Sequence, residues 1–325
     1  VLKVKNIIRD YDVIGIIGLS KNSGKTTTLN YLLSLFSTEK IGLTSIGLDG
    51  ESFDQVNFLP KPKIYLKENM VVATASTCLS VDDPYYEVLD DTNIMTALGE
   101  VVIVRILKSC QFVIAGPTTN KELGKVIDKM KPYVDKLFVD GAFNRMTFTN
   151  LSLLDGICLA AGASYHIDME ETIKQTLWIE KAMSLPKTHQ DLKLLQKPMT
   201  IKTNTQTLYH VEKNITHLSQ FHPNSIEWIY IGGAVTHKLV DGIIKRKDTH
   251  LTIIADDWTK FLFDHRTSKH LETLNIQLEV IKTSQLLMVT VNPFSPSNHH
   301  YEKTLFLKRM KNTLTTPVFN VLEME

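Results

Sequence analysis

Residues 18–27 read Gly18-Leu19-Ser20-Lys21-Asn22-Ser23-Gly24-Lys25-Thr26-Thr27. An apolar run precedes them at 13–17, and leucine and phenylalanine recur at helical spacing after them, over 29–36. A strand, a glycine-containing turn, Gly-Lys-Thr and a helix form the context of a phosphate-binding loop, or P-loop. The sequence therefore predicts an α/β fold with a P-loop in its first strand–helix unit.

Each part of this loop has an expected role in nucleotide binding. Backbone N–H groups at the helix N-terminus would surround the β-phosphate. The Lys25 ammonium would bridge the β- and γ-phosphates, and the Thr26 hydroxyl would ligate Mg²⁺. We therefore expect ATP or ADP with Mg²⁺ as cofactors, and the expected binding residues are Asn22, Ser23, Gly24, Lys25, Thr26 and Thr27.

The first glycine of the loop departs from the usual P-loop pattern. The pattern Gly-x-x-x-x-Gly-Lys-Thr places this glycine where Leu19 stands, whereas Gly18 lies one residue earlier. The alternative interpretation is a glycine turn that only joins a buried strand to a helix. We favour the P-loop because Gly-Lys-Thr and both flanking elements occur in register.

The composition and net charge of the chain are those of a globular protein and exclude several kinds of partner. The 325 residues are 43% hydrophobic and 22% charged, as in globular proteins. The net charge is +1 without a basic block, so neither nucleic acid nor an anionic membrane is an expected partner. No signal-type leader and no window near about 18 apolar residues is recognised, so we expect a cytoplasmic protein without a transmembrane helix. The three cysteines lack metal-ligand spacing.

Near-continuous apolar strands alternate with helices in the first half of the chain. Such strands are typical of a parallel sheet that is covered on both faces. Segments 63–66 and 70–74 are interpreted as a hairpin. A polar stretch at 185–200 contains two prolines and is the expected linker. We predict a nucleotide-binding domain at 1–186 and a second, smaller α/β domain at 200–325.

Acidic residues at strand ends are candidates for holding magnesium, because ligands of parallel sheets bind beyond the carboxyl ends of the strands. Asp140 follows the apolar run 137–139 and is the expected Walker B residue. Asp49 ends the strand after the P-loop helix and could hold Mg²⁺ or orient the attacking water, and Glu51 lies nearby. The expected catalytic residues are therefore Lys25, Asp49 and Asp140, and the expected metal ligands are Thr26, Asp49 and Asp140. The alternative is that each carboxylate only caps a turn.

Several motifs occur in an order that resembles a known family. They are Gly-x-Ser-Lys-Asn-Ser-Gly-Lys-Thr-Thr-Thr at 18–28, Gly-x-Asp-Gly-Glu at 47–51, Lys-Pro-Lys-Ile-Tyr at 61–65, Val-Asp-Gly-Ala-Phe-Asn-Arg at 139–145, Leu-Ala-Ala-Gly-Ala-Ser at 159–164 and Val-Asn-Pro-Phe-Ser-Pro at 291–296. Together they resemble the P-loop subunit of the lysine 5,6-aminomutase and ornithine aminomutase reactivases.

The resemblance implies a P-loop NTPase domain of the SIMIBI type and an ATPase that remodels another protein. Its implied partners are a MutS-like ATPase subunit and an adenosylcobalamin-dependent aminomutase, whose damaged cofactor would be exchanged. A second copy of this chain, in a homodimer, is a further candidate partner. The second domain is the expected docking surface. The alternative function is a small-molecule kinase or ligase, because cyclic 2,3-diphosphoglycerate synthetase has a similar glycine loop.

Overall fold

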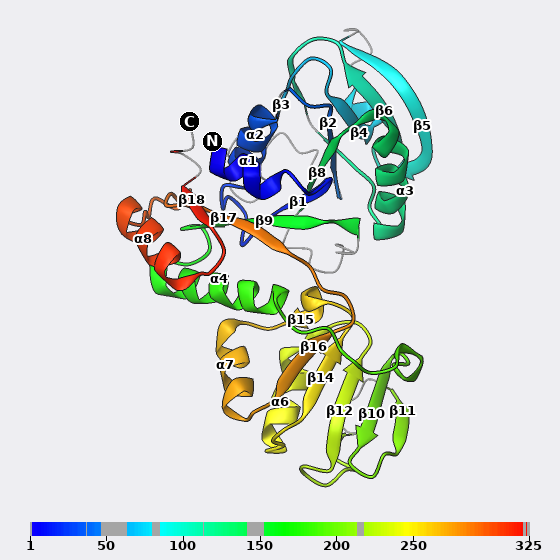
Figure 1. The fold of residues 1–325 in the computed structure, drawn as a ribbon, viewed down its shortest axis with the longest axis vertical. Helices are drawn as coiled ribbons and strands as arrows, with labels where there is room; N and C mark the ends of the chain where they lie inside the picture. Colours follow the sequence, from blue (N-terminus) through cyan, green and yellow to red (C-terminus); the bar gives the residue numbers. More distant parts are fainter. Residues whose placement is uncertain are drawn as a thin grey trace. The chain divides into compact units, whose positions relative to one another are not determined.

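The computed structural model describes residues 2–36, 38–46, 64–79, 85–112, 114–141, 153–212, 218–320 and 323. These residues form two compact units. The first unit consists of Val1–Ile173 together with Gln285–Glu325, and the inserted unit is Lys174–Ser284. The chain therefore leaves the first unit and returns to it, as the colour order in Figure 1 shows.

A nine-stranded sheet forms the centre of the first unit, in the order β18-β17-β9-β1-β8-β2-β4-β6-β5. The pairs from β18 to β4 are parallel, and β6 pairs antiparallel with both β4 and β5. The strands are β1 (Val13–Gly18), β2 (Ile41–Ser45), β4 (Val71–Ala75), β5 (Tyr86–Thr96), β6 (Gly99–Ile106), β8 (Lys136–Asp140), β9 (Gly156–Gly162), β17 (Leu286–Asn292) and β18 (Val318–Asn320). A separate antiparallel pair is β3 (Ile64–Leu66) with β7 (Cys110–Phe112).

The helices of the first unit are α1 (Leu2–Ile8), α2 (Lys25–Leu35), α3 (Asn120–Met130) and α8 (Lys303–Thr313), while α4 (Met169–Met183) runs from the first unit into the inserted unit. Among the described helices, none combines the length and apolar character that a membrane crossing requires.

Burial agrees with the interior position of β1 in this sheet, between β9 and β8. Every residue of β1, β8 and β9 is buried, as expected for parallel strands that are covered on both faces. On α2, the apolar side chains of Leu29, Leu32 and Leu33 are buried in the core cluster that includes Ile14 and Ile16 of β1. Burial of each such side chain contributes about 1.5–3 kcal/mol, so the helix that follows the loop is held firmly by its apolar face.

The inserted unit has its own five-stranded sheet, in the order β11-β10-β12-β14-β16. Its strands are β10 (Met199–Thr203), β11 (Leu208–Val211), β12 (Ile226–Ile231), β14 (Thr252–Ala255) and β16 (Gln277–Val280), with a two-stranded parallel pair, β13 (Val235–Thr236) and β15 (Phe261–Leu262). The parallel strands β12, β14 and β16 are connected through α6 (His237–Lys245) and α7 (His265–Thr273).

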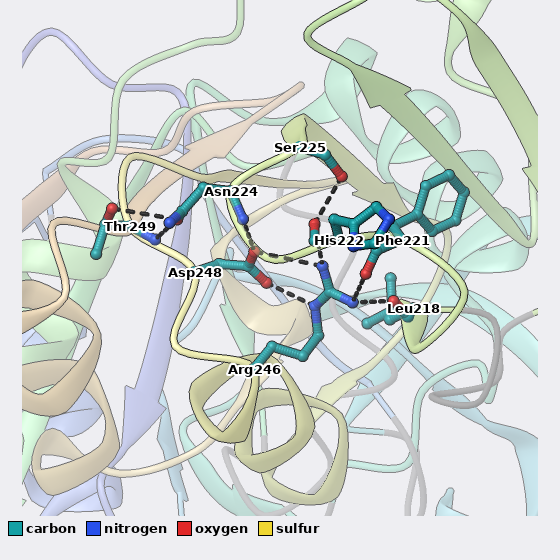
Figure 2. A network of polar contacts seen from close by, with 8 residues as sticks. All are labelled: Leu218, Phe221, His222, Asn224, Ser225, Arg246, Asp248 and Thr249. Atoms are coloured by element: carbon teal, nitrogen blue, oxygen red, sulfur yellow. Dashed lines mark hydrogen bonds and ion pairs between the residues drawn. The ribbon is translucent and has the colours of Figure 1, made fainter.

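A buried ion pair in the inserted unit links the loop after α6 to the loop before β12 (Figure 2). Arg246, just after α6, places Nε 2.6 Å from Asp248 Oδ2. Its guanidinium also donates to the carbonyl oxygens of Leu218, Phe221 and His222. Only 11% of the Arg246 side chain and 2% of the Asp248 side chain are exposed. The pair therefore supports the loop that leads into β12.

The expected α/β class with a mostly parallel sheet is confirmed, but the chain is divided differently from the expected domains 1–186 and 200–325. Segment 285–325 contributes β17, α8 and β18 to the first unit. The expected hairpin at 63–74 is also wrong. β3 pairs with β7, whereas β4 lies in the main sheet next to β2.

Candidate functional site

The segment 18–27 forms the turn between β1 and α2. Asn22 and Gly24 have positive φ angles of 60° and 98°, which bend the chain sharply at the start of the helix. Gly24 is the N-cap of α2 and has no side chain that could cap it. The N–H groups of the first helical turn have no acceptor within a helix, so they are suited to bind an anion.

Close contacts account for a glycine at position 18. A Cβ atom on Gly18 would lie 2.4 Å from Ser23 Oγ and 3.2 Å from Ser20 O, because the loop folds back over the end of β1. Any larger residue at position 18 would displace the Ser23 hydroxyl and crowd the Ser20 carbonyl oxygen. Ser23 is 1% exposed, and its hydroxyl has no hydrogen-bond partner among the described residues. A buried hydroxyl of this kind fits a loop that completes its contacts with a ligand.

Lys25 and Asp140 meet beside this loop. Asp140 ends β8, the strand next to β1, and pairs in register with Ile16. Lys25 Nζ lies 3.0 Å from Asp140 Oδ1 and donates a 3.0 Å hydrogen bond to the carbonyl oxygen of Gly141. The side chains are 18% and 7% exposed, so the pair is largely shielded from water. The structure thus brings together two of the three predicted catalytic residues.

The other predicted site residues fall into two groups. Thr26 is half-buried and Thr27 exposed, both in the first turn of α2. Asp49 and Glu51 lie outside the described residues, so their predicted roles stay predictions. In the described part of the chain, no three His, Cys, Asp or Glu side chains are grouped to hold a metal ion. Mg²⁺ commonly uses one or two protein oxygens together with phosphate and water oxygens. Thr26 and Asp140 can supply the protein oxygens.

Sequence reasoning missed the residues that flank the loop from β9 and β17. Asn292, at the end of β17, donates from Nδ2 to the carbonyl oxygen of Asn22 over 3.2 Å. Ser164, just beyond β9, has its hydroxyl 2.9 Å from that of Ser20. The Val-Asn-Pro-Phe-Ser-Pro motif at 291–296 is visible in the sequence, but nothing local connects it with a loop at 18–27.

Comparison of the chain with family models, curated proteins and solved structures gives no match.

Asp140→Asn is expected to weaken Mg²⁺-dependent nucleotide binding or turnover by about 10- to 100-fold, the range found when groups that support a metal are replaced. The amide keeps the size of the side chain and removes the charge that would face both Mg²⁺ and Lys25. Glu51→Gln is the matched control, with the same carboxylate-to-amide change, and we expect a smaller effect from it. Magnesium titrations at fixed nucleotide measure both. A larger loss in Glu51→Gln would show that the acidic partner has been assigned to the wrong residue.

Proposed function

We propose that this chain binds Mg-ATP or Mg-ADP through the 18–27 loop and acts as a P-loop NTPase of the SIMIBI type. The observation that carries the proposal is the position of Lys25. Its ammonium lies at the junction of the loop, the start of α2 and the acidic end of β8, 3.0 Å from Asp140 Oδ1. A cation, helix N-terminal amides and a neighbouring carboxylate together match the chemistry of a magnesium-bound polyphosphate.

Lys25, Asp140 and Thr26 would each have a separate role in binding the magnesium-bound nucleotide. Lys25 has a flexible stem and can move its ammonium from Asp140 to a phosphate oxygen. That movement leaves the Asp140 carboxylate available to hold magnesium or one of its waters, while Thr26 offers a hydroxyl from the helix. When bound, Mg²⁺ would neutralise charge on the phosphates. The amides at the start of α2 are already oriented, so binding requires little rearrangement of the loop.

The proposed biological role is that of an ATP-dependent reactivase subunit, and its support is the motif resemblance. Such a subunit would cooperate with a MutS-like ATPase to release damaged cofactor from an adenosylcobalamin-dependent aminomutase. It must bind its client differently in its ATP and ADP states, because only differential affinity can shift a client's conformation. A coupling of about 1–3 kcal/mol would change client affinity by roughly 5- to 150-fold. The inserted unit is the proposed docking surface.

The reactivase role predicts recovery of an inactivated client. The aminomutase is first inactivated by turnover, and this chain, the MutS-like partner, ATP and fresh adenosylcobalamin are then added. We expect activity to return with the wild-type chain and not with Lys25→Ala, because remodelling requires nucleotide at the loop. Equal recovery with Lys25→Ala, or none in the complete mixture, would contradict the reactivase role and favour a small-molecule kinase or ligase.

A further inference from the structure

The end of β17 contacts the phosphate loop through a side chain. Asn292 Nδ2 donates to the carbonyl oxygen of Asn22 over 3.2 Å, and Asn292 Oδ1 accepts from the backbone N–H of Phe294 over 3.1 Å. The second bond fixes the amide group, so its NH₂ side is directed at the loop. Asn292 is therefore anchored on its own strand end and holds one carbonyl of the loop.

That carbonyl belongs to a peptide group whose orientation matters for anion binding. Asn22 has a φ of 60°, a conformation that non-glycine residues adopt rarely. In a trans peptide the C=O and the following N–H point in opposite directions. Holding Asn22 O toward Asn292 therefore turns the N–H of Ser23 away from Asn292. The hydrogen bond thus stabilises both an uncommon backbone angle and the direction of a loop amide.

Two glycines allow β9 and β17 to approach the loop closely. A Cβ on Gly24 would lie 3.1 Å from Asn292 Cβ. A Cβ on Gly162, at the end of β9, would lie 3.0 Å from Asn292 O and 3.1 Å from Ser23 O. The loop backbone, Asn292 and the end of β9 therefore lie so close together that a side chain at either glycine would crowd its neighbours.

A buried hydroxyl pair makes a second connection between β17 and α2. Thr28 Oγ1 lies 2.7 Å from Thr290 Oγ1 and donates to Gly24 O over 3.0 Å. Because the Thr28 hydroxyl has one proton and gives it to Gly24 O, Thr290 is the donor in the pair. Both threonines are fully buried, 0% and 1% exposed. Thr290 thus supports the hydroxyl that holds the N-cap carbonyl of the helix.

We propose that Asn292 and Thr290 are positioning residues that hold the phosphate loop in its nucleotide-binding conformation. This inference rests on the proposed nucleotide site and adds that the site is completed by β17, the strand through which the chain returns from the inserted unit. The residues act through Asn22 and Thr28 and need not touch the nucleotide.

The test uses the full chain and Mg-ADP as the probe. Asn292→Ala and Asn292→Asp both remove the donor to Asn22 O, and Asn292→Asp keeps an acceptor for Phe294. We expect calorimetry to show Kd raised about tenfold in Asn292→Ala, the equivalent of one lost hydrogen bond, and at least as much in Asn292→Asp. Thr290→Val should raise Kd roughly fivefold, and Thr290→Ser, which restores the hydroxyl, should bind within about twofold of wild type. Asn312→Ala, on an exposed position of α8, is the control and should leave Kd unchanged.

Hydrogen exchange of the peptide covering 18–27, measured without nucleotide, separates positioning from general destabilisation. Exchange should accelerate there in Asn292→Ala, while the peptides of β1 and β8 stay as protected as in wild type. Unchanged exchange and unchanged Kd in both Asn292 variants would overturn the inference and leave the nucleotide site intact. If wild type itself does not bind Mg-ADP, the proposed function fails, and so does this inference.

Discussion

Asp248→Ala is expected to destabilise the inserted unit by about 3–5 kcal/mol, the cost of removing one partner of a buried ion pair. The Arg246 guanidinium would stay buried next to three carbonyl oxygens without the carboxylate that neutralises it (Figure 2). Asp248 Oδ1 also accepts from the Asn224 N–H over 2.7 Å, so the substitution leaves that amide without its acceptor too. A loss of this size is a large part of the stability of an ordinary domain.

The tryptophans make this prediction measurable in the full chain. All three, Trp178, Trp228 and Trp258, belong to the inserted unit, so their fluorescence reports urea unfolding of that unit. Glu272→Ala is the matched control, because it removes the exposed partner of Lys181 in the same unit. Surface pairs contribute about 0–1 kcal/mol, so the control should hardly move the transition. A transition in Asp248→Ala that coincides with that of Glu272→Ala would show that the buried pair does not support the fold.

Lys25→Ala is expected to abolish stabilisation of the protein by Mg-nucleotide. A ligand near 100 times its Kd that binds only the folded state adds about 2.7 kcal/mol, which corresponds to a rise in melting temperature of roughly 5–10 °C. Lys25→Ala also leaves the Asp140 carboxylate without its ammonium partner, 3.0 Å away in the wild type. The variant's own melting temperature should therefore fall somewhat, and the informative quantity is the shift that nucleotide causes in each variant.

Lys21→Ala is the control for this prediction, because it removes an exposed lysine of the same loop. It should keep most of the nucleotide-induced shift, since Lys21 lies before the Gly24 turn rather than at the start of α2. Scanning calorimetry with and without Mg-ADP measures all three chains. Equal shifts in wild type and Lys25→Ala would remove Lys25 from the binding site.

The sequence predicted the parts of the candidate site that are local. The apolar run of β1, the glycine turn and the apolar face of α2 all lie within residues 13–35, and each has a local pattern that identifies it. The nearness of Asp140 was also predictable, because the carboxyl ends of parallel strands share one edge of a sheet. Local patterns and this rule for parallel sheets were therefore enough to predict that Lys25 and Asp140 lie near each other.

Pairing between distant strands was not predictable in the same way. β17 has the apolar pattern of a buried strand, which fits either unit equally well, and nothing in its residues shows that it pairs with β9. Its order along the chain favours the second domain, whereas the structure places it in the first unit. The contact of Asn292 with the loop depends on that pairing, so the sequence did not predict this contact either. The β3 segment, three residues long, likewise carries too little pattern to identify β7 as its partner.

Direct titration of Mg-ADP and Mg-ATP into the wild-type chain tests whether the loop at 18–27 is a nucleotide site. We expect calorimetry to show saturable binding that is weakened when Mg²⁺ is removed with EDTA, retained in Lys21→Ala and lost in folded Lys25→Ala. Absence of binding by a folded wild-type chain, or equal binding by Lys25→Ala, would contradict this expectation.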